Sequence, residues 1–266
     1  MGVYVHIPFC EQKCYYCDFH SVVAGDEESF SSVVSDYFLS LRREALYYKK
    51  LWEDRALRTI FIGGGTPSIV PAEQLASFIL FLRNELPFVA EPEITIEANP
   101  HSLHYEGAAV LSKAGANRVS LGVQAFQNRL LKAIGRVHTS DQIGQSVGAL
   151  KRAGITNINL DLMFGLPGQG ISDWTETLRE AVALRPTHLS CYGLILEDET
   201  PLARWVSAGI VHLPSDDEQA EMYDLACEML KEEAYEHYEI SNFCEPGMEC
   251  QHNLLYWHNE PFIALG

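Results

Sequence analysis

The chain has 266 residues, 47% of them hydrophobic, with 19 basic against 36 acidic side chains and a formal net charge of -17. This length supports one barrel-sized domain or two smaller ones, the composition excludes a disordered chain, and the negative charge disfavours nucleic acid as a partner. No apolar run reaches the roughly 18 residues of a membrane span and no basic leader opens the sequence, so we expect a cytoplasmic protein with reduced cysteines.

Strand-like and helical segments alternate along the first 213 residues. Runs rich in β-branched and aromatic residues predict six strands, at 2–7, 58–63, 93–98, 117–123, 155–164 and 188–195. Amphipathic segments predict helices over 27–51, 72–85, 103–114, 141–153 and 172–184. Several strands read as apolar on both faces, and parallel neighbours need crossovers, so we expect a parallel sheet covered by helices. The periodicity leaves open a barrel of β/α units or an open doubly wound sheet.

The pattern changes after the sixth strand. Residues 214–243 predict one acidic helix followed by a short strand, and residues 244–266 predict no helix. The final residues, 261–266, resemble the start of another element, so we expect the natural protein to continue beyond Gly266. The predicted organisation is therefore a core over 1–213 and an extension over 214–266 that begins a truncated C-terminal domain.

Three of the seven cysteines, Cys10, Cys14 and Cys17, form the pattern C-x-x-x-C-x-x-C directly after the first predicted strand. Such a cluster of reduced thiols indicates a metal-binding or redox-active site. One hypothesis is structural zinc, which takes four protein ligands and would need His6 or His20 as the fourth. The other is an iron–sulfur cube, which normally takes four thiolates, so that three would leave one iron open for a reaction.

The cysteine loop, within "YVHIPFCEQKCYYCDF", resembles the signature of the radical S-adenosylmethionine (SAM) superfamily. The resemblance implies an α/β fold, a partial (β/α)6 TIM-like barrel. It also implies a [4Fe-4S] cluster on Cys10, Cys14 and Cys17, with SAM bound to the fourth iron. In that superfamily the reduced cluster cleaves SAM, while the protein positions SAM and excludes water.

Further motifs follow in the order of that superfamily. "FIGGGTPS" lacks the Gly-Lys-Ser/Thr of a phosphate loop. The resemblance implies instead that Gly64, Gly65 and Thr66 contact the methionine end of SAM. Taken singly, a polar residue at a strand end more often caps the strand, but β/α folds gather ligand groups there. The resemblance extends the SAM site to Tyr4, Tyr16, Glu97, Gln124, Arg136, Asp161 and Ile195.

"GGGTPS", "GVQAF" and "DLMFGLPGQ" resemble the oxygen-independent coproporphyrinogen III oxidase group, which includes the heme chaperone branch HemW. The oxidase has a further cysteine two residues after the third, where this chain has Phe19. It also has a long N-terminal extension ahead of the first strand, whereas Tyr4 is already the fourth residue of this sequence. Both departures favour HemW. That branch implies heme as bound cargo delivered to heme-requiring apoproteins, and it leaves peripheral membrane contact and a homodimer open.

Two alternatives to the chaperone hypothesis remain at this point. The first is the oxidase itself, which converts coproporphyrinogen III to protoporphyrinogen IX by radical oxidative decarboxylation. The second is a cluster protein whose barrel serves structure or electron transfer only.

The segment "HNLLYW", at 252–257, resembles the H-N-x-x-Y-W motif of the HemW branch, which is associated with heme binding. The resemblance implies a heme motif of His252, Asn253, Tyr256 and Trp257, with an imidazole as candidate iron ligand and the aromatic rings against the porphyrin. The alternative is structural: His252 and Asn253 would hydrogen-bond the backbone in a turn while the aromatic rings pack under the barrel.

Overall fold

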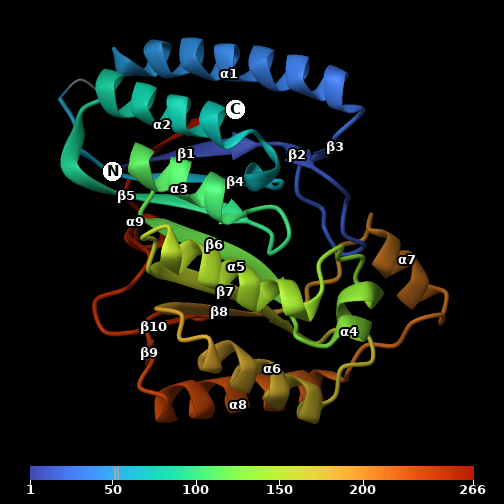
Figure 1. Cartoon of the computed structure of the whole chain (residues 1–266). Coiled ribbons are helices and arrows are strands. Elements are labelled where there is room, and N and C mark those ends of the chain that lie inside the picture. Colours follow the sequence, from blue (N-terminus) through green and yellow to red (C-terminus); the bar gives the residue numbers. More distant parts are fainter. Residues whose placement is uncertain (51, 53) are drawn as a thin grey trace.

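The computed structural model describes residues 1–50, 52 and 54–266, and its central feature is a nine-stranded sheet (Figure 1). Six parallel strands form the middle of this sheet, in the order β1 (Gly2–Ile7), β4 (Leu57–Gly64), β5 (Phe88–Ala98), β6 (Arg118–Gln124), β7 (Asn157–Phe164) and β8 (His188–Gly193). They are the six predicted strands. Because their spatial order follows the chain without reversal, the sheet winds as a barrel and not as a doubly wound sheet. The predicted partial barrel is confirmed.

The crossover helices cover the outer face of the sheet (Figure 1). α1 packs on α2, α2 on α3, and α3 on α5. Each helix lies within two residues of its predicted bounds at its described ends, and Leu51, the predicted last residue of the first helix, lies outside the described residues. The observed helices are α1 (Glu27–Lys49), α2 (Ala72–Glu85), α3 (Tyr105–Ala114), α5 (Ser140–Arg152) and α6 (Ile171–Ala183).

The hydrophobic core lies between the outer face of the sheet and the helices. On β1, Val3, Val5 and Ile7 are fully buried in it, and the alternate residues of the strand face inward. The expectation that several strands are apolar on both faces is wrong for the middle of the sheet. The inward residues there are polar, because they line a cavity in place of the packed layers usual in a barrel interior.

Several short elements without a predicted counterpart follow the carboxyl ends of the strands. They are the two-stranded sheet of β2 (Phe9–Cys10) and β3 (Val22–Val23), the 3-10 helix η1 (Pro67–Ile69), and the helices α4 (Asn128–Ala133) and α7 (Pro201–Ser207). Each spans two turns or fewer, too short for a hydrophobic period to show in the sequence. Figure 1 shows α4 and α7 at the end of the sheet where the strand arrows point.

The C-terminal residues extend both edges of the same sheet. After α8 (Asp216–Glu232) and β9 (Glu236–His237), β10 (Asn242–Cys244) pairs antiparallel with β8. β11 (Phe262–Leu265) pairs parallel with β1 at the opposite edge. The division at 213/214 stays a prediction. Among the described residues no helix is long and apolar enough to cross a lipid bilayer.

The prediction of no helix in 244–266 is wrong, because α9 (Gln251–Trp257) lies there. The carboxylate of Glu93, on β5, accepts hydrogen bonds from the backbone N–H groups of Gln251 and His252, each at 3.0 Å. A negative charge at these otherwise unpaired N–H groups stabilises the start of a helix. This cap comes from a residue 158 positions away from Gln251, so no local pattern reveals it.

Candidate functional site

The loop that carries the three cysteines is held at the carboxyl ends of the strands by the short unpredicted elements. The N–H of Tyr15 donates to the carbonyl of Ile134 at 3.0 Å, and the N–H of Leu202, on α7, donates to the carbonyl of Tyr15 at 2.9 Å. The Tyr15 ring also packs edge-on against Trp205, with centroids 4.9 Å apart. The loop is therefore fixed from the segment after α4 and from α7.

Each of the three thiols has a distinct environment. Cys10 is buried, and its sulfur accepts from the hydroxyl of Thr66 at 3.7 Å. The sulfur of Cys14 accepts from the guanidinium of Arg136 at 3.5 Å. The N–H of Cys17 donates to the carbonyl of Cys14 at 3.2 Å, and burial raises the pKa of the Cys17 thiol.

The three thiols are not gathered around one point in the structure. Thiolates bound to one zinc ion lie within about 4.6 Å of each other, and no group of three His, Cys, Asp or Glu side chains in the described part of the chain is close enough to hold one ion. His6, a candidate fourth zinc ligand, bonds the carbonyl of His20 at 2.8 Å and the hydroxyl of Tyr4 at 3.1 Å. Three free thiols on one loop fit a cluster, whose separate irons hold its ligands further apart.

The glycine-rich segment after β4 lies directly against the cysteine loop. The N–H of Gly65 donates to the carbonyl of Ile7 at 2.8 Å, and that of Thr66 donates to the carbonyl of Phe9 at 2.7 Å. A Cβ on Gly65 would lie 2.6 Å from the carbonyl oxygen of Phe9, so only glycine permits this approach. Gly64 turns away with a φ of 112° and donates its N–H to Glu97 at 3.0 Å.

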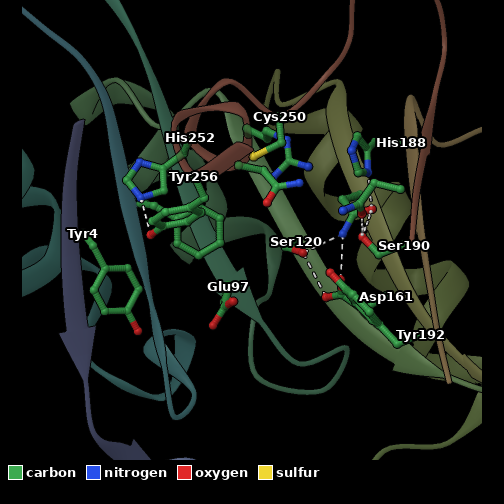
Figure 2. A pocket seen from close by; sticks show the side chains of 15 residues that line it. Tyr4, Glu97, Ser120, Asp161, His188, Ser190, Tyr192, Cys250, His252 and Tyr256 are labelled. Atoms are coloured by element: carbon green, nitrogen blue, oxygen red, sulfur yellow. Dashed lines mark hydrogen bonds between the residues drawn. The ribbon is translucent and has the colours of Figure 1, made fainter. Parts of the chain in front are cut away.

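Two buried carboxyl groups face the interior below this segment. Burial, reinforced by the charge of Asp161, raises the pKa of Glu97 to about 7. Burial also raises the pKa of Asp161, although its carboxylate accepts from Ser120 at 2.9 Å and from Asn159 at 2.8 Å. Figure 2 shows Glu97 and Asp161 pointing into one cavity. Both are therefore available to a ligand with hydrogen-bond donors.

Arg136 and Gln124 complete the polar wall. Arg136 donates to the carbonyl of Gly122 and to the side chain of Asn99, while its Nε is buried without a partner. Gln124 adopts a φ of 65°, rare outside glycine, and its side-chain oxygen is buried without a partner. Asn99, which also donates to Thr66 at 3.2 Å, was missed, although it directly follows β5.

The remaining predicted SAM residues differ in position. Tyr4 lines the inner cavity, and burial together with the charge of Glu97 raises its pKa. Tyr16 is half-buried near Arg136, whose charge opposes the rise that burial causes in the tyrosine pKa. Ile195 is 72% exposed and lies beyond the end of β8, so the structure does not bring it to this group.

The inward side chains of the strands enclose a cavity of about 200 Å³ (Figure 2). Sequence reasoning missed most of its lining, including the buried Arg118 and His188, because a polar face that alternates with an apolar one is equally typical of a strand face in contact with solvent. Its lining residues are Tyr4, Phe61, Glu97, Arg118, Ser120, Asn159, Asp161, His188, Ser190, Tyr192, Asn242, Cys250, His252, Asn253 and Tyr256.

The predicted heme motif lies on α9, near the amino ends of the strands and so at the opposite end from the cysteine loop (Figure 1). His252 is 1% exposed, and its ring nitrogens bond the hydroxyls of Thr59 at 2.7 Å and Tyr256 at 3.0 Å. Burial lowers its pKa to about 4. Asn253 lines the cavity, while Tyr256 and Trp257 are 46% and 52% exposed. The structure thus gives His252 a packing role and leaves the aromatic rings accessible.

Replacing His252 by Ala is expected to lower the free energy of unfolding by about 2–4 kcal/mol, because it empties a buried site and removes two hydrogen bonds. Urea denaturation measures the change. The matched control is His258→Ala, since His258 is exposed at the end of α9 and the change should stay within about 0.5 kcal/mol. Equal stability of the two variants would contradict the packing role.

Comparison with known proteins agrees with this geometry. A three-cysteine loop at the carboxyl ends of a partial barrel is the arrangement of a radical SAM protein, and the model of the Radical SAM superfamily matches residues 4–181. Two relatives, each named "Heme chaperone HemW", are 42% identical (Lactococcus lactis) and 39% identical (Synechocystis) over 100% of this chain. The chain belongs to the HemW family of the radical SAM superfamily. It spans 68% and 64% of the length of these two relatives.

A solved structure shares the fold. Coproporphyrinogen III oxidase (HemN) from Escherichia coli, a radical SAM enzyme, superposes with a TM-score of 0.84 over 100% of this chain and 63% of its own. Its sequence is 23% identical, so the likeness concerns the fold alone. The predicted family is confirmed by these comparisons.

Proposed function

We propose that this chain is the radical SAM part of a heme chaperone that binds heme and delivers it to heme-requiring apoproteins. The observation that carries the proposal is the identity of 42% with a heme chaperone over the whole of this chain, which includes the cysteine loop and the C-terminal motif. A cytoplasmic location belongs to the same proposal.

Membership of the superfamily implies a [4Fe-4S] cluster and SAM. In the proposed site Cys10, Cys14 and Cys17 hold the cluster, which together with SAM supplies one-electron chemistry. The fit rests on three free thiols beside the glycine-rich segment and on the unpartnered buried atoms of Gln124 and Arg136. No residue of this chain is assigned a catalytic role.

Four side chains are proposed to bind SAM itself. The carboxylate of Glu97 accepts from the ammonium group, and the guanidinium of Arg136 pairs with the SAM carboxylate. Asp161 and the unpartnered amide of Gln124 hold the ribose hydroxyls. The short elements that press the cysteine loop onto the sheet keep water away from the bound group.

For heme, the accessible part of the C-terminal motif is its aromatic pair. Tyr256 and Trp257 are about half exposed and line an open cavity of about 380 Å³, whereas the His252 nitrogens are engaged. Flat aromatic side chains bind a porphyrin ring by stacking and burial of apolar area. We therefore assign the porphyrin contact to Tyr256 and Trp257 and not to iron ligation by His252.

Heme titration into the anaerobically reconstituted chain tests the proposal. Wild type is expected to bind heme, and Trp257→Ala to bind about tenfold more weakly, a loss of about 1.4 kcal/mol. Tyr47→Ala, which removes a ring 68% exposed on α1, is the matched control and should bind as wild type does. Absence of heme binding by wild type, or an equal loss of heme affinity in both variants, would contradict the proposal.

The shared fold with the oxidase motivates a second assay. Coproporphyrinogen III incubated anaerobically with the reconstituted chain, SAM and a reductant is expected to remain unconverted. Phe19, at the place of the additional cysteine of the oxidase, is 65% exposed and supplies no ligand. Formation of protoporphyrinogen IX would favour the oxidase instead.

A further inference from the structure

The inner cavity contains a buried cation that makes no hydrogen bond. Arg118, the first residue of β6, is 2% exposed and lines the cavity. Among the described residues no hydrogen bond or ion pair reaches its guanidinium, and its Nε is sealed off from solvent with no acceptor. An arginine side chain is always charged and presents five donors. A buried guanidinium with unused donors is costly, so its retention indicates that a ligand supplies the acceptor.

The nearby carboxylates do not fill this role. Burial lowers the pKa of Arg118, but nearby acidic groups, among them Cys250, Glu93 and Asp161, raise it above its usual value. Yet Glu93 accepts the backbone N–H groups at the start of α9, and Asp161 accepts from Ser120 and Asn159. Neither carboxylate makes a hydrogen bond or an ion pair with the guanidinium, whose fork is therefore open to an anion from outside.

The inner cavity adjoins an open cavity on the side of the heme motif. The open cavity of about 380 Å³ shares four lining residues with the inner one: Tyr192, Asn242, Asn253 and Tyr256. Its outer wall includes Trp257, and its other residues are Glu239 and Ser241. The open cavity, with its aromatic side chains, therefore forms a mouth next to the polar interior, and the side chain of Asn253 lies in their common wall.

The sizes of the two cavities decide what can enter each. About 200 Å³ is below the roughly 300–1,000 Å³ of pockets that bury a drug-sized ligand, so the inner cavity excludes a porphyrin ring. A short ligand substituent that ends in a carboxylate fits the inner cavity. A guanidinium prefers a carboxylate, which accepts two parallel hydrogen bonds, and amide donors such as Asn253 add to them.

We propose that Arg118 binds a carboxylate of the cargo: a propionate arm of heme enters the inner cavity while the porphyrin ring rests against Tyr256 and Trp257 in the mouth. This inference rests on the proposed function and assigns a residue that the family motifs do not contain. It explains why the barrel interior is polar from Ser120 to Asn242, and why the aromatic motif stands at the opening of that interior.

The test compares heme with heme dimethyl ester, whose propionates are blocked, in the same detergent buffer. Wild type is expected to bind the ester about tenfold more weakly than heme, because the charge-assisted pair is lost. Arg118→Gln should bind heme as weakly as wild type binds the ester, and it should no longer distinguish the two. Arg118→Lys should recover part of the preference for heme over the ester, because lysine keeps the positive charge but lacks the planar guanidinium that donates two parallel hydrogen bonds. Arg179→Gln, on the exposed side of α6, makes the same charge change as a control.

The comparison of heme with its dimethyl ester uses the wild-type protein, so it does not depend on whether any variant folds. Equal affinity of wild type for heme and ester overturns the assignment of Arg118 while heme binding itself stands. An equal loss for both ligands in Arg118→Gln also overturns it, because it indicates a structural role. Failure of wild type to bind either ligand overturns the proposed function and this inference with it.

Discussion

Replacing Cys14 by Ser is expected to abolish cluster assembly, so that the reconstituted chain falls from about four irons to almost none. The loop has three thiols and no spare one: the other four cysteines lie at positions 191, 227, 244 and 250, outside the loop. Serine keeps the volume but is a poor ligand for iron. The loss of the cluster should be complete because the two remaining thiolates cannot hold it at this site.

Iron and sulfide analysis measures this loss, together with visible and electron paramagnetic resonance spectra with and without SAM. Cys227→Ser, on α8 and remote from the loop, is the matched control and should assemble a full cluster whose signal SAM perturbs. A full cluster in Cys14→Ser, or its loss in Cys227→Ser, would contradict the assignment of the three ligands.

Much of the fold was predictable from the sequence because its strands, helices and loop motifs depend on residues close together in the chain. The six strands and five crossover helices follow from hydrophobic periodicity. The cysteine loop follows from ligand spacing, and Gly65 and Thr66 follow from a motif whose backbone must approach that loop. In each case the pattern and the structure that it determines lie within a few residues of each other.

The parts that were missed depend on contacts between distant segments. The helix α9 begins where Glu93 caps it, and α4 and α7 are fixed through Tyr15 of the cysteine loop. Arg118 was missed because the sequence does not show whether the polar face of its strand meets solvent or a cavity, and only the paired register places it beside Thr95 and Asn157. Tertiary context, and not propensity, decides such positions.

The positions of the two motifs suggest how cluster and cargo share one fold. The cysteine loop lies at the carboxyl ends of the strands, and the aromatic motif on α9 lies near their amino ends (Figure 1). The polar cavity lies between them, with Glu97 and Asp161 toward the cluster side and Arg118 toward the cargo side. In the proposed protein a ligand in the mouth and SAM at the cluster would therefore approach the same interior from opposite ends.

Glu97→Gln is expected to stabilise the fold above neutral pH while it weakens SAM binding. The pKa of Glu97 is raised from 4.5 to about 7 by burial, so the native state holds a proton that the unfolded state releases. A raised carboxyl pKa gives a stability contribution that is complete below pH 4.5 and is lost as pH rises through 7. Glutamine keeps an acceptor for the N–H of Gly64 but never ionises.

The expected gain follows from the size of this pKa shift. By pH 8 the wild type has lost about 2–3 kcal/mol that the variant retains, and at pH 5 the two should differ by less than about 1 kcal/mol. Urea denaturation at the two pH values measures the gap. Glu180→Gln, at an exposed position of α6, is the control and should show no gap that grows with pH. A constant gap for Glu97→Gln would show that this carboxyl titrates normally.

Binding measurements connect the same carboxyl to its proposed ligand. Wild type should bind SAM more tightly as pH rises through about 7, because the ionised carboxylate pairs with the ammonium group while the neutral acid does not. Glu97→Gln should lose about tenfold or more in SAM affinity at pH 8 and should lack this pH dependence. A variant that gains stability yet binds SAM as wild type does would show that the Glu97 carboxylate does not contribute to SAM binding. Higher stability together with weaker SAM binding would show instead that the fold tolerates an unfavourable buried carboxylate because SAM requires it.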